Sequence, residues 1–157
     1  MSLDDDINIL SQTSFFESIN AEQLRLLAFG ADAENLIAGE ELFLQDAQSD
    51  CGYVVVSGLI DLTINSNGTE KILGSVEPGG LVGELALITD NNRATSAVAR
   101  RDTRLLRIPR VLFMRMLDKY PETAYDLHHK ILRSVRSTIL QLEKIQVEFE
   151  SKYLGEE

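Results

Sequence analysis

GELALITDNNRATS, residues 83–96, is the stretch from which the organisation of this chain can be worked out. Gly83 and Glu84 open a short apolar run, and Arg93 follows Glu84 by nine residues, after four polar residues at 89–92. The apolar run is shorter than an ordinary helix, which averages about 11–12 residues. A glutamate and an arginine placed around so short a turn indicate a binding site.

The residues that lead into this stretch prepare a site for an anion. Residues 78–84 (PGGLVGE) deliver the chain to a predicted helix N-terminus at 84–87, where backbone N–H groups lack partners inside the helix. Gly83 lets a phosphate approach the backbone, and Arg93 can add a two-pronged charge-assisted contact. A carboxylate beside an anion needs a hydroxyl donor, and a ribose 2′-OH would supply one to Glu84. Phosphate, ribose and an apolar interior together predict a nucleotide.

Length and composition place the chain among ordinary globular proteins. Its 157 residues suffice for one domain with an appendage, and 44% of them are hydrophobic and 25% charged. No run of about 18 apolar residues could span a membrane, and the acidic N-terminus lacks the features of a secretory signal. Cys51 is the one cysteine, which excludes a disulfide framework and a cysteine metal cluster. We therefore expect a cytoplasmic protein that makes no membrane contact.

The net charge of −10 is unevenly distributed. Residues 1–92 hold 2 Lys or Arg against 16 Asp or Glu, whereas residues 93–157 hold 13 against 9. An acidic whole offers no field that would steer DNA toward it. The arginines of the second part could form a local patch, but we favour solvent-facing positions paired with the acidic part. These arginines are Arg100, Arg101, Arg104, Arg107, Arg110 and Arg115.

Between residues 33 and 108, short runs of branched apolar residues alternate with turn residues. The Asn67-Gly68 pair suits a tight hairpin whose residues need positive φ. Such runs, with no helices between most of them, predict about eight strands in an antiparallel barrel or jelly roll. The runs are Leu36-Ile37, Leu42-Phe43-Leu44, Tyr53 to Val56, Ile60/Leu62/Ile64, Ile72-Leu73, Ala97-Val98-Ala99 and Leu105-Leu106-Ile108.

Helices are predicted on both sides of the strand region. Asn20, with Gln23 three residues later, is typical of a capped helix that continues to about Phe29. Pro109 can open a short helix to about Lys119, since the first helical position needs no N–H donor.

Pro121 opens a second and much longer predicted helix, which nothing interrupts before Tyr153 and which spans about 50 Å. Apolar residues along it keep the 4–3 spacing of a coiled-coil seam, with Gln146 as a polar member that can fix register. One small barrel cannot bury so long a seam, so we expect a homodimer through residues 125–153; the alternative is a helix folded back on its own barrel. The seam is Leu132, Val135, Ile139, Leu142, Gln146, Phe149 and Tyr153.

The 82–87 segment (VGELAL) followed by 93–96 (RATS) resembles the phosphate-binding cassette of the cyclic nucleotide-binding domain family. Catabolite activator protein and the regulatory subunits of protein kinase A share this module. The similarity extends over about residues 14–142. Further matching positions are Gly39-Glu40, Tyr53, Gly58 and Pro78-Gly79.

The resemblance implies a role for each residue of the cassette. Glu84 would accept from the ribose 2′-OH and Arg93 would bind the exocyclic phosphate oxygen. Backbone groups would complete the cradle, at Gly83, Leu85, Ala86, Ala94 and Thr95. Two positions depart from the family pattern: Val82 replaces a phenylalanine, and Asp46-Ala47 replaces a Gly-Asp pair that places a helper residue near the arginine.

The preferred base follows from weaker signals. Ala94 directly after Arg93 resembles the kinase regulatory subunits that prefer cAMP, whereas a hydroxyl at that position is associated with cGMP. We expect cAMP, with cGMP as the alternative. In catabolite activator protein a threonine at the position corresponding to Thr138, counted from the helix-opening proline, caps the adenine. Ser137 and Thr138 could cap the base here, or they could be solvent-facing helix residues.

These observations predict an α+β protein in three parts. Residues 1–13 form a tail or short helix, residues 14–120 an antiparallel jelly-roll-like β-barrel that binds the nucleotide, and residues 121–157 a long dimerisation helix. No catalytic set is visible, so we expect a sensory domain without enzymatic activity, cofactor or metal, which signals to an unknown partner protein. A degenerate interaction module is one alternative. The other is the sensory half of a DNA-binding regulator. We expect no DNA-binding domain in this chain itself, so the chain would supply only the sensory half.

Overall fold

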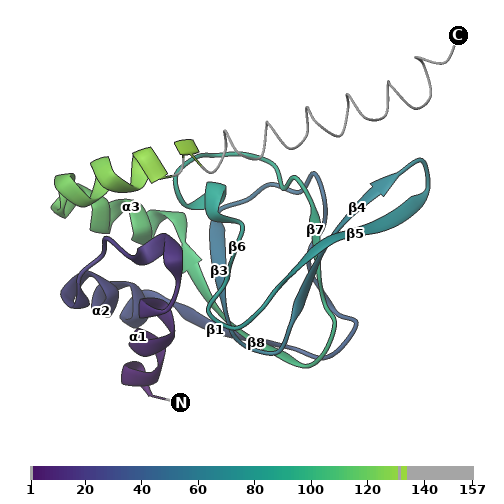
Figure 1. Ribbon diagram of the computed structural model, residues 1–157, viewed down its shortest axis with the longest axis horizontal. Helices are drawn as coiled ribbons and strands as arrows, with labels where there is room; N and C mark the ends of the chain where they lie inside the picture. The colour runs from purple at the N-terminus through teal and green to yellow at the C-terminus, as the bar shows by residue number, and fades with distance from the viewer. Residues whose placement is uncertain (1, 131, 134–157) are drawn as a thin grey trace, which may run out of the picture.

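The computed structural model describes residues 2–130, 132 and 133, which form two layers of strands and a layer of helices (Figure 1). The helical segments before the strands are α1 (Leu3–Ser11), η1 (Ser14–Phe16) and α2 (Ala21–Gly30). The strands are β1 (Asp32–Leu36), β2 (Glu41–Phe43), β3 (Cys51–Ser57), β4 (Ile60–Ser66), β5 (Thr69–Val76), β6 (Leu81–Val82), β7 (Ser96–Ala99) and β8 (Thr103–Pro109). Between β6 and β7 lies η2 (Glu84–Leu87), and α3 (Arg110–Lys119) follows β8.

The strands form two antiparallel sheets of four, in the orders β1-β8-β3-β6 and β2-β7-β4-β5. This confirms the predicted antiparallel strand architecture. Of the expected antiparallel barrel or jelly roll, the arrangement is consistent with the jelly roll, but the sheets are not closed into a barrel, because neither sheet pairs with the other along an edge. The two sheets instead pack face to face, as in a β-sandwich. Two of the strands, β2 and β6, have only three and two residues, which is too few to continue a ladder around a barrel.

Strands β3 and β8 contribute buried apolar residues to both faces of their sheet; β3 is buried without a break from Cys51 to Val55, whereas β8 carries Arg104 and Arg107 between its buried residues. Tyr53 and Leu105 belong to the core between the sheets. Their neighbours Val54 and Leu106 point the other way, into the core beneath the helices. One sheet therefore serves two hydrophobic cores.

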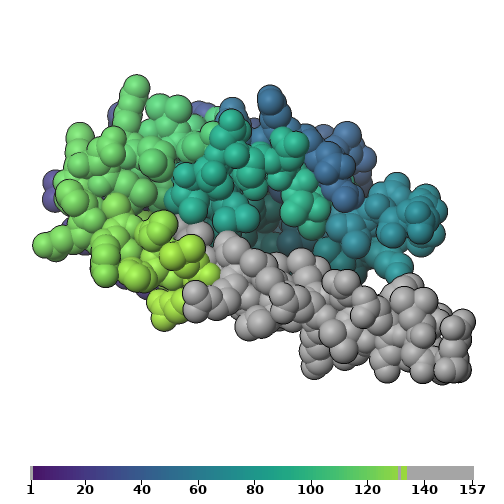
Figure 2. All heavy atoms as spheres, turned by 90° about the horizontal axis from the view of Figure 1, so that it is seen from above, coloured from purple at the N-terminus to yellow at the C-terminus, as the bar shows by residue number. Residues whose placement is uncertain are grey.

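The helical layer covers the outer face of this sheet, with α1, α2 and α3 gathered at one end of the molecule (Figure 1). Its core contains three aromatic rings whose centroids lie 5.4–6.2 Å apart, from Phe15, Phe16 and Phe113. The predicted cap of α2 is confirmed: the Asn20 side chain accepts from Gln23 N at 2.9 Å, and the Gln23 side chain accepts from Asn20 N at 2.8 Å. The hairpin of β4 and β5 forms the opposite end of the molecule (Figures 1 and 2).

Residues 121–130, 132 and 133 continue as a helix after Tyr120, so the predicted helix start at Pro121 is confirmed. The rest of the predicted seam, from Val135 to Tyr153, lies outside the described residues, as do Ser137 and Thr138. Among the described residues, no helix is long and apolar enough to cross a membrane.

Tight turns depend on backbone conformations that side chains disfavour. Asn67 and Gly68 have φ of 54° and 82°, which confirms the predicted hairpin between β4 and β5. Gly58 has φ of 95°, and a Cβ added there would lie 2.5 Å from the Asp102 carbonyl oxygen and 2.6 Å from Thr103 Cα. The β3–β4 turn can therefore sit against the start of β8 only with glycine at position 58.

We expect Gly58→Ala to lower the free energy of unfolding by about 3 kcal/mol, because it adds a disfavoured backbone conformation to a steric overlap with main-chain atoms. Gly68→Ala has a positive φ but open space, and should cost about 1 kcal/mol. Gly74→Ala has neither problem and should change stability by less than about 0.5 kcal/mol. Urea unfolding of the three variants measures these differences. Equal costs at positions 58 and 68 would contradict the steric argument.

Candidate functional site

A pocket of about 350 Å³ opens between β6, η2 and the loop that leads into β7. Phe43 from β2 and Leu62 from β4 form its apolar side. Its volume falls within the range of about 300–1,000 Å³ that is usual for small-molecule sites. The seven pocket residues named from the cassette all line it, namely Gly83, Glu84, Leu85, Ala86, Arg93, Ala94 and Thr95.

The entrance to the cassette is set by Gly83, which adopts a left-handed conformation with φ of 77°. The predicted helix N-terminus after it is a single turn of 3-10 helix. The Ala86 N–H already donates to the Gly83 carbonyl oxygen at 3.1 Å. This turn is therefore a weaker anion site than a longer helix would be, and the charge of the pocket comes from side chains.

Arg93 carries the positive charge of the pocket while only 6% of it is exposed. Its Nη2 donates to the Cys51 carbonyl oxygen at 2.8 Å, and its guanidinium carbon lies 4.1 Å from the centre of the Phe43 ring. Its Nε is buried and has no hydrogen-bond partner. Among the described residues, no carboxylate lies within salt-bridge distance of it. A buried cation in this state is costly and strongly favours an anion at its free edge.

The main chain on both sides of Arg93 is held by strand-like hydrogen bonds. Arg93 N donates to the Ala47 carbonyl oxygen and Asp46 N donates to the Arg93 carbonyl oxygen, both at 2.8 Å. Asp46 adopts φ of 71°, a conformation that aspartate tolerates better than most residues. The Asp46-Ala47 departure from the family pattern therefore leaves the backbone of the arginine well supported.

The aromatic and cysteine contacts of Arg93 were not predicted from the sequence. The Cys51 carbonyl oxygen and the Cys51 Sγ, which lies 3.6 Å from Nη2, both face the guanidinium. Tyr53 lies 5.9 Å from the same group, and burial, with a smaller effect of Cys51, raises the pKa of its hydroxyl, so the ring stays neutral. The alternation of Cys51, Tyr53 and Val55 on one face of β3 was the signal that could have placed them together.

The first residue of α3 is connected to the pocket. Arg110 Nε donates to the Ala86 carbonyl oxygen at 2.7 Å, and its Nη2 donates to the Ser49 carbonyl oxygen. The Arg110 side chain thus joins the cassette turn η2 to the helical layer. No sequence pattern indicated this contact.

Two arginines of the arginine-rich segment pair with carboxylates of the first part of the chain. Arg100 pairs with Asp61 at 2.9 Å, and Arg107 lies 3.4 Å from Asp50 and 3.6 Å from Asp32. These pairs confirm, for Arg100 and Arg107, the interpretation that the arginines pair with the acidic part of the chain.

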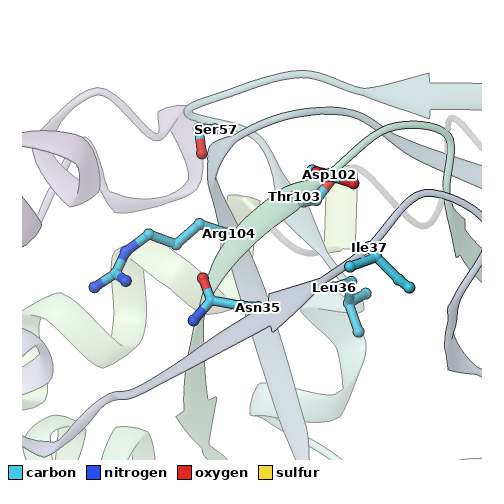
Figure 3. Close-up of a pocket in the computed structure, with 7 residues that line it drawn as sticks. All are labelled: Asn35, Leu36, Ile37, Ser57, Asp102, Thr103 and Arg104. Atoms are coloured by element: carbon cyan, nitrogen blue, oxygen red, sulfur yellow. The ribbon is translucent and has the colours of Figure 1, made fainter.

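A second concavity, of about 380 Å³, lies between β1 and the start of β8 (Figure 3). Two of its polar side chains are engaged in the fold: Asp102 Oδ1 accepts from Ala38 N at 2.9 Å, and Thr103 Oγ1 accepts from Leu59 N at 3.1 Å. The Arg104 side chain points away from both (Figure 3). The concavity therefore offers no convergent set of groups. Within the described part of the chain, no cluster of His, Cys, Asp and Glu residues could hold a metal ion.

Comparison with known proteins identifies related domains. The family model described as the cyclic nucleotide-binding domain matches residues 33–120. A cyclic nucleotide-binding-like protein from Brucella abortus is 45% identical, with a TM-score of 0.66 over 73% of this chain and 98% of that one. Catabolite activator protein from Thermus thermophilus is 28% identical, with a TM-score of 0.73 over 84% of this chain and 62% of that one.

A similarity of a different kind involves a much longer protein. Mouse patatin-like phospholipase domain-containing protein 6 is 29% identical over 121 residues, which are 76% of this chain and 9% of that protein. The chain thus spans a small part of the length of this relative.

We expect Gly83→Ala to lower the free energy of unfolding by about 3 kcal/mol, because the new methyl group would adopt a left-handed φ and overlap Arg93 Nη1. In an Arg93→Ala background the overlap disappears, and the same change should cost about 1.5 kcal/mol. Urea unfolding of the two single variants and the double variant gives the coupling energy. Equal costs in both backgrounds would show that the guanidinium does not lie against Gly83.

Proposed function

Because this chain belongs to the cyclic nucleotide-binding domain family, we propose that it binds a cyclic nucleotide at the Arg93 pocket and acts as a sensory domain. The observation that carries the proposal is the buried Arg93, whose Nε lacks a partner and whose charge no described carboxylate neutralises. A cyclic phosphate carries one negative charge, and its exocyclic oxygens match the fork of a guanidinium.

The remaining cassette residues fit the ribose and phosphate. Glu84 lines the same pocket as Arg93, so its carboxylate can accept from a ribose 2′-OH while Arg93 holds the phosphate. Leu62 and Leu85 supply apolar surface next to them. Ala94 favours cAMP, as the resemblance implied, and cGMP is the alternative, with Thr95 as a nearby hydroxyl in the same pocket.

The signal passes from the pocket to the helices. A phosphate drawn against Gly83 and Arg93 acts on η2, and the Ala86 carbonyl oxygen of η2 is the acceptor for Arg110 at the start of α3. A ligand shifts a conformational balance only by binding one arrangement better than another, so this contact must differ between the two states.

Homodimerisation through residues 125–153 and capping of the base by Ser137 or Thr138 stay part of the proposal as predictions from sequence. A degenerate pocket that serves only protein interaction is the second candidate. Its clearest support is the absence of the family's helper residue at Asp46-Ala47. The similar regulators and the long phospholipase-domain protein suggest two settings for the domain: it could be attached to a DNA-binding module or to an enzyme. In either setting it would be the regulatory part and not the catalytic part.

We expect the protein to bind cAMP and Arg93→Ala to weaken binding by about 1.5–3 kcal/mol, or roughly 10- to 150-fold in Kd, through loss of the charge-assisted contact. Titration calorimetry with cAMP and cGMP measures both affinities. Arg101→Ala, which removes an exposed arginine outside the pocket, is the matched control and should leave Kd unchanged. Absence of binding at millimolar nucleotide would favour the degenerate module.

The same titration tests Glu84 with 2′-deoxy-cAMP. The unaltered protein should prefer cAMP by about tenfold, the size of one hydrogen bond to a charged group. In Glu84→Ala that preference should vanish while Arg93-dependent binding persists. An unchanged preference in Glu84→Ala would remove Glu84 from the ribose site.

The connection to the helices predicts a pattern of hydrogen exchange. Addition of cAMP should increase protection at residues 83–96 and also in α3. Arg110→Ala should keep the increase at residues 83–96 and lose most of it in α3, because the contact to the Ala86 carbonyl oxygen is gone. Arg115→Ala, also in α3 but without a contact to η2, is the control. Equal protection of α3 in Arg110→Ala would exclude this route.

A further inference from the structure

Helices α2 and α3 lie side by side (Figure 1), and they border an apolar groove that shares no lining residue with the Arg93 pocket. The groove has a volume of about 200 Å³ and is lined on one side by Leu26 and Phe29 and on the other by Leu112 and Met116. Gly30 explains the geometry, since a Cβ there would lie 2.7 Å from a Leu112 methyl group. The two helices approach each other closely at Gly30 and Leu112, and the groove lies next to this contact.

The groove has an exposed aromatic ring at its edge. Phe29 is 82% exposed although it is the largest side chain of α2, and Leu26 beside it is also exposed. The inner face of α2 is buried by Leu24, Leu27 and Ala28, so Phe29 is not needed for the core. An exposed aromatic ring at the edge of an apolar groove is typical of an anchor point for a partner.

The charged residues that line the groove are both basic, Arg115 and Lys119. Neither forms a salt bridge with another described residue, whereas Arg100, Arg107, Arg110 and Lys130 all do. On α2 and α3 together, four basic residues stand against two acidic ones, in a chain whose net charge is −10. The groove is therefore a basic surface with no internal counter-charge on an acidic protein.

We propose that this groove binds a short acidic amphipathic helix of a partner protein, with an apolar residue in the groove and carboxylates against Arg115 and Lys119. Each bordering helix has 10 residues, about 15 Å, which matches about three turns of a bound helix. The volume lies below the usual range for drug-sized ligands and suits a side chain.

Two other occupants fit less well. A second copy of the chain related by a two-fold axis would bring both pairs of cations into one interface, where like charges repel. An anionic membrane is an extended surface and would also face the acidic residues outside the groove, which it would repel, whereas a short peptide contacts the groove alone. The proposal does not depend on nucleotide binding.

The test uses a stapled helical peptide of about 15 residues with Leu and Phe one turn apart and glutamates on both flanks, together with a twin in which lysines replace the glutamates. Fluorescence anisotropy should show saturable binding of the acidic peptide, at least about tenfold tighter than the twin and weaker at high salt. Phe29→Ser should weaken binding by at least about tenfold. The double variant Arg115→Glu, Lys119→Glu should reverse the preference.

Val111→Ser is the matched control, because Val111 is an exposed apolar residue of α3 that does not line the groove, and it should leave binding unchanged. Urea unfolding verifies that each variant is folded. The proposal is overturned if the two peptides bind equally, if millimolar acidic peptide does not bind, or if Phe29→Ser has no effect. Binding to anionic vesicles in place of the peptide, or self-association that Phe29→Ser abolishes, would overturn it as well.

Discussion

The guanidinium of Arg93 is buried against the core of a small β-sandwich, and much of the surrounding structure serves to hold it there. The guanidinium lies over the Phe43 ring and donates to the Cys51 carbonyl oxygen, and the absence of a side chain at Gly83 leaves room for Nη1. Moving an unpaired charge out of water costs several kcal/mol, so the domain stores free energy that a bound anion can release. Arg93 therefore favours anion binding and, at the same time, lowers the stability of the protein without a bound anion.

The position of this arginine depends on a sheet that is buried on both faces. The inward residues of β3 approach Arg93, and the outward residues of the same strand pack beneath the helices. Leu87 of η2 lies against Gly52 of β3, so the cassette rests directly on this strand. Under the proposed function, a displacement of η2 by a ligand would be transmitted to a closely packed strand and, through Arg110, to α3.

Charge is divided in the fold as it is in the sequence. The acidic first part of the chain supplies Asp32, Asp50 and Asp61, which neutralise arginines of the second part. Arg93 in the pocket and Arg115 and Lys119 at the groove form no such ion pair with the described residues. Unpaired positive charge thus stands at both places for which we propose an anionic ligand and an acidic partner.

Much of this protein could be predicted from its sequence, because the signals are local. The Asn20–Gln23 capping box depends on a spacing of three residues, the Asn67-Gly68 hairpin on two adjacent residues, and the cassette on one stretch of residues 82–96. Local hydrogen bonds and disfavoured φ values leave a direct mark on residue choice. The strand runs were visible for a similar reason, since alternation reports burial on one or both faces.

What only the tertiary structure decided are contacts between residues far apart in the chain. Whether two sheets close into a barrel depends on edge pairing between strands, and β2 and β6 are too short for it. The ring of Phe43 over Arg93, and Arg110 on the Ala86 carbonyl oxygen, join residues 50 and 24 positions apart. The groove between α2 and α3 likewise brings together residues far apart in the chain, with Gly30 close to Leu112. Such contacts depend on how the whole chain packs and not on the order of neighbouring residues. No short sequence pattern therefore reveals them.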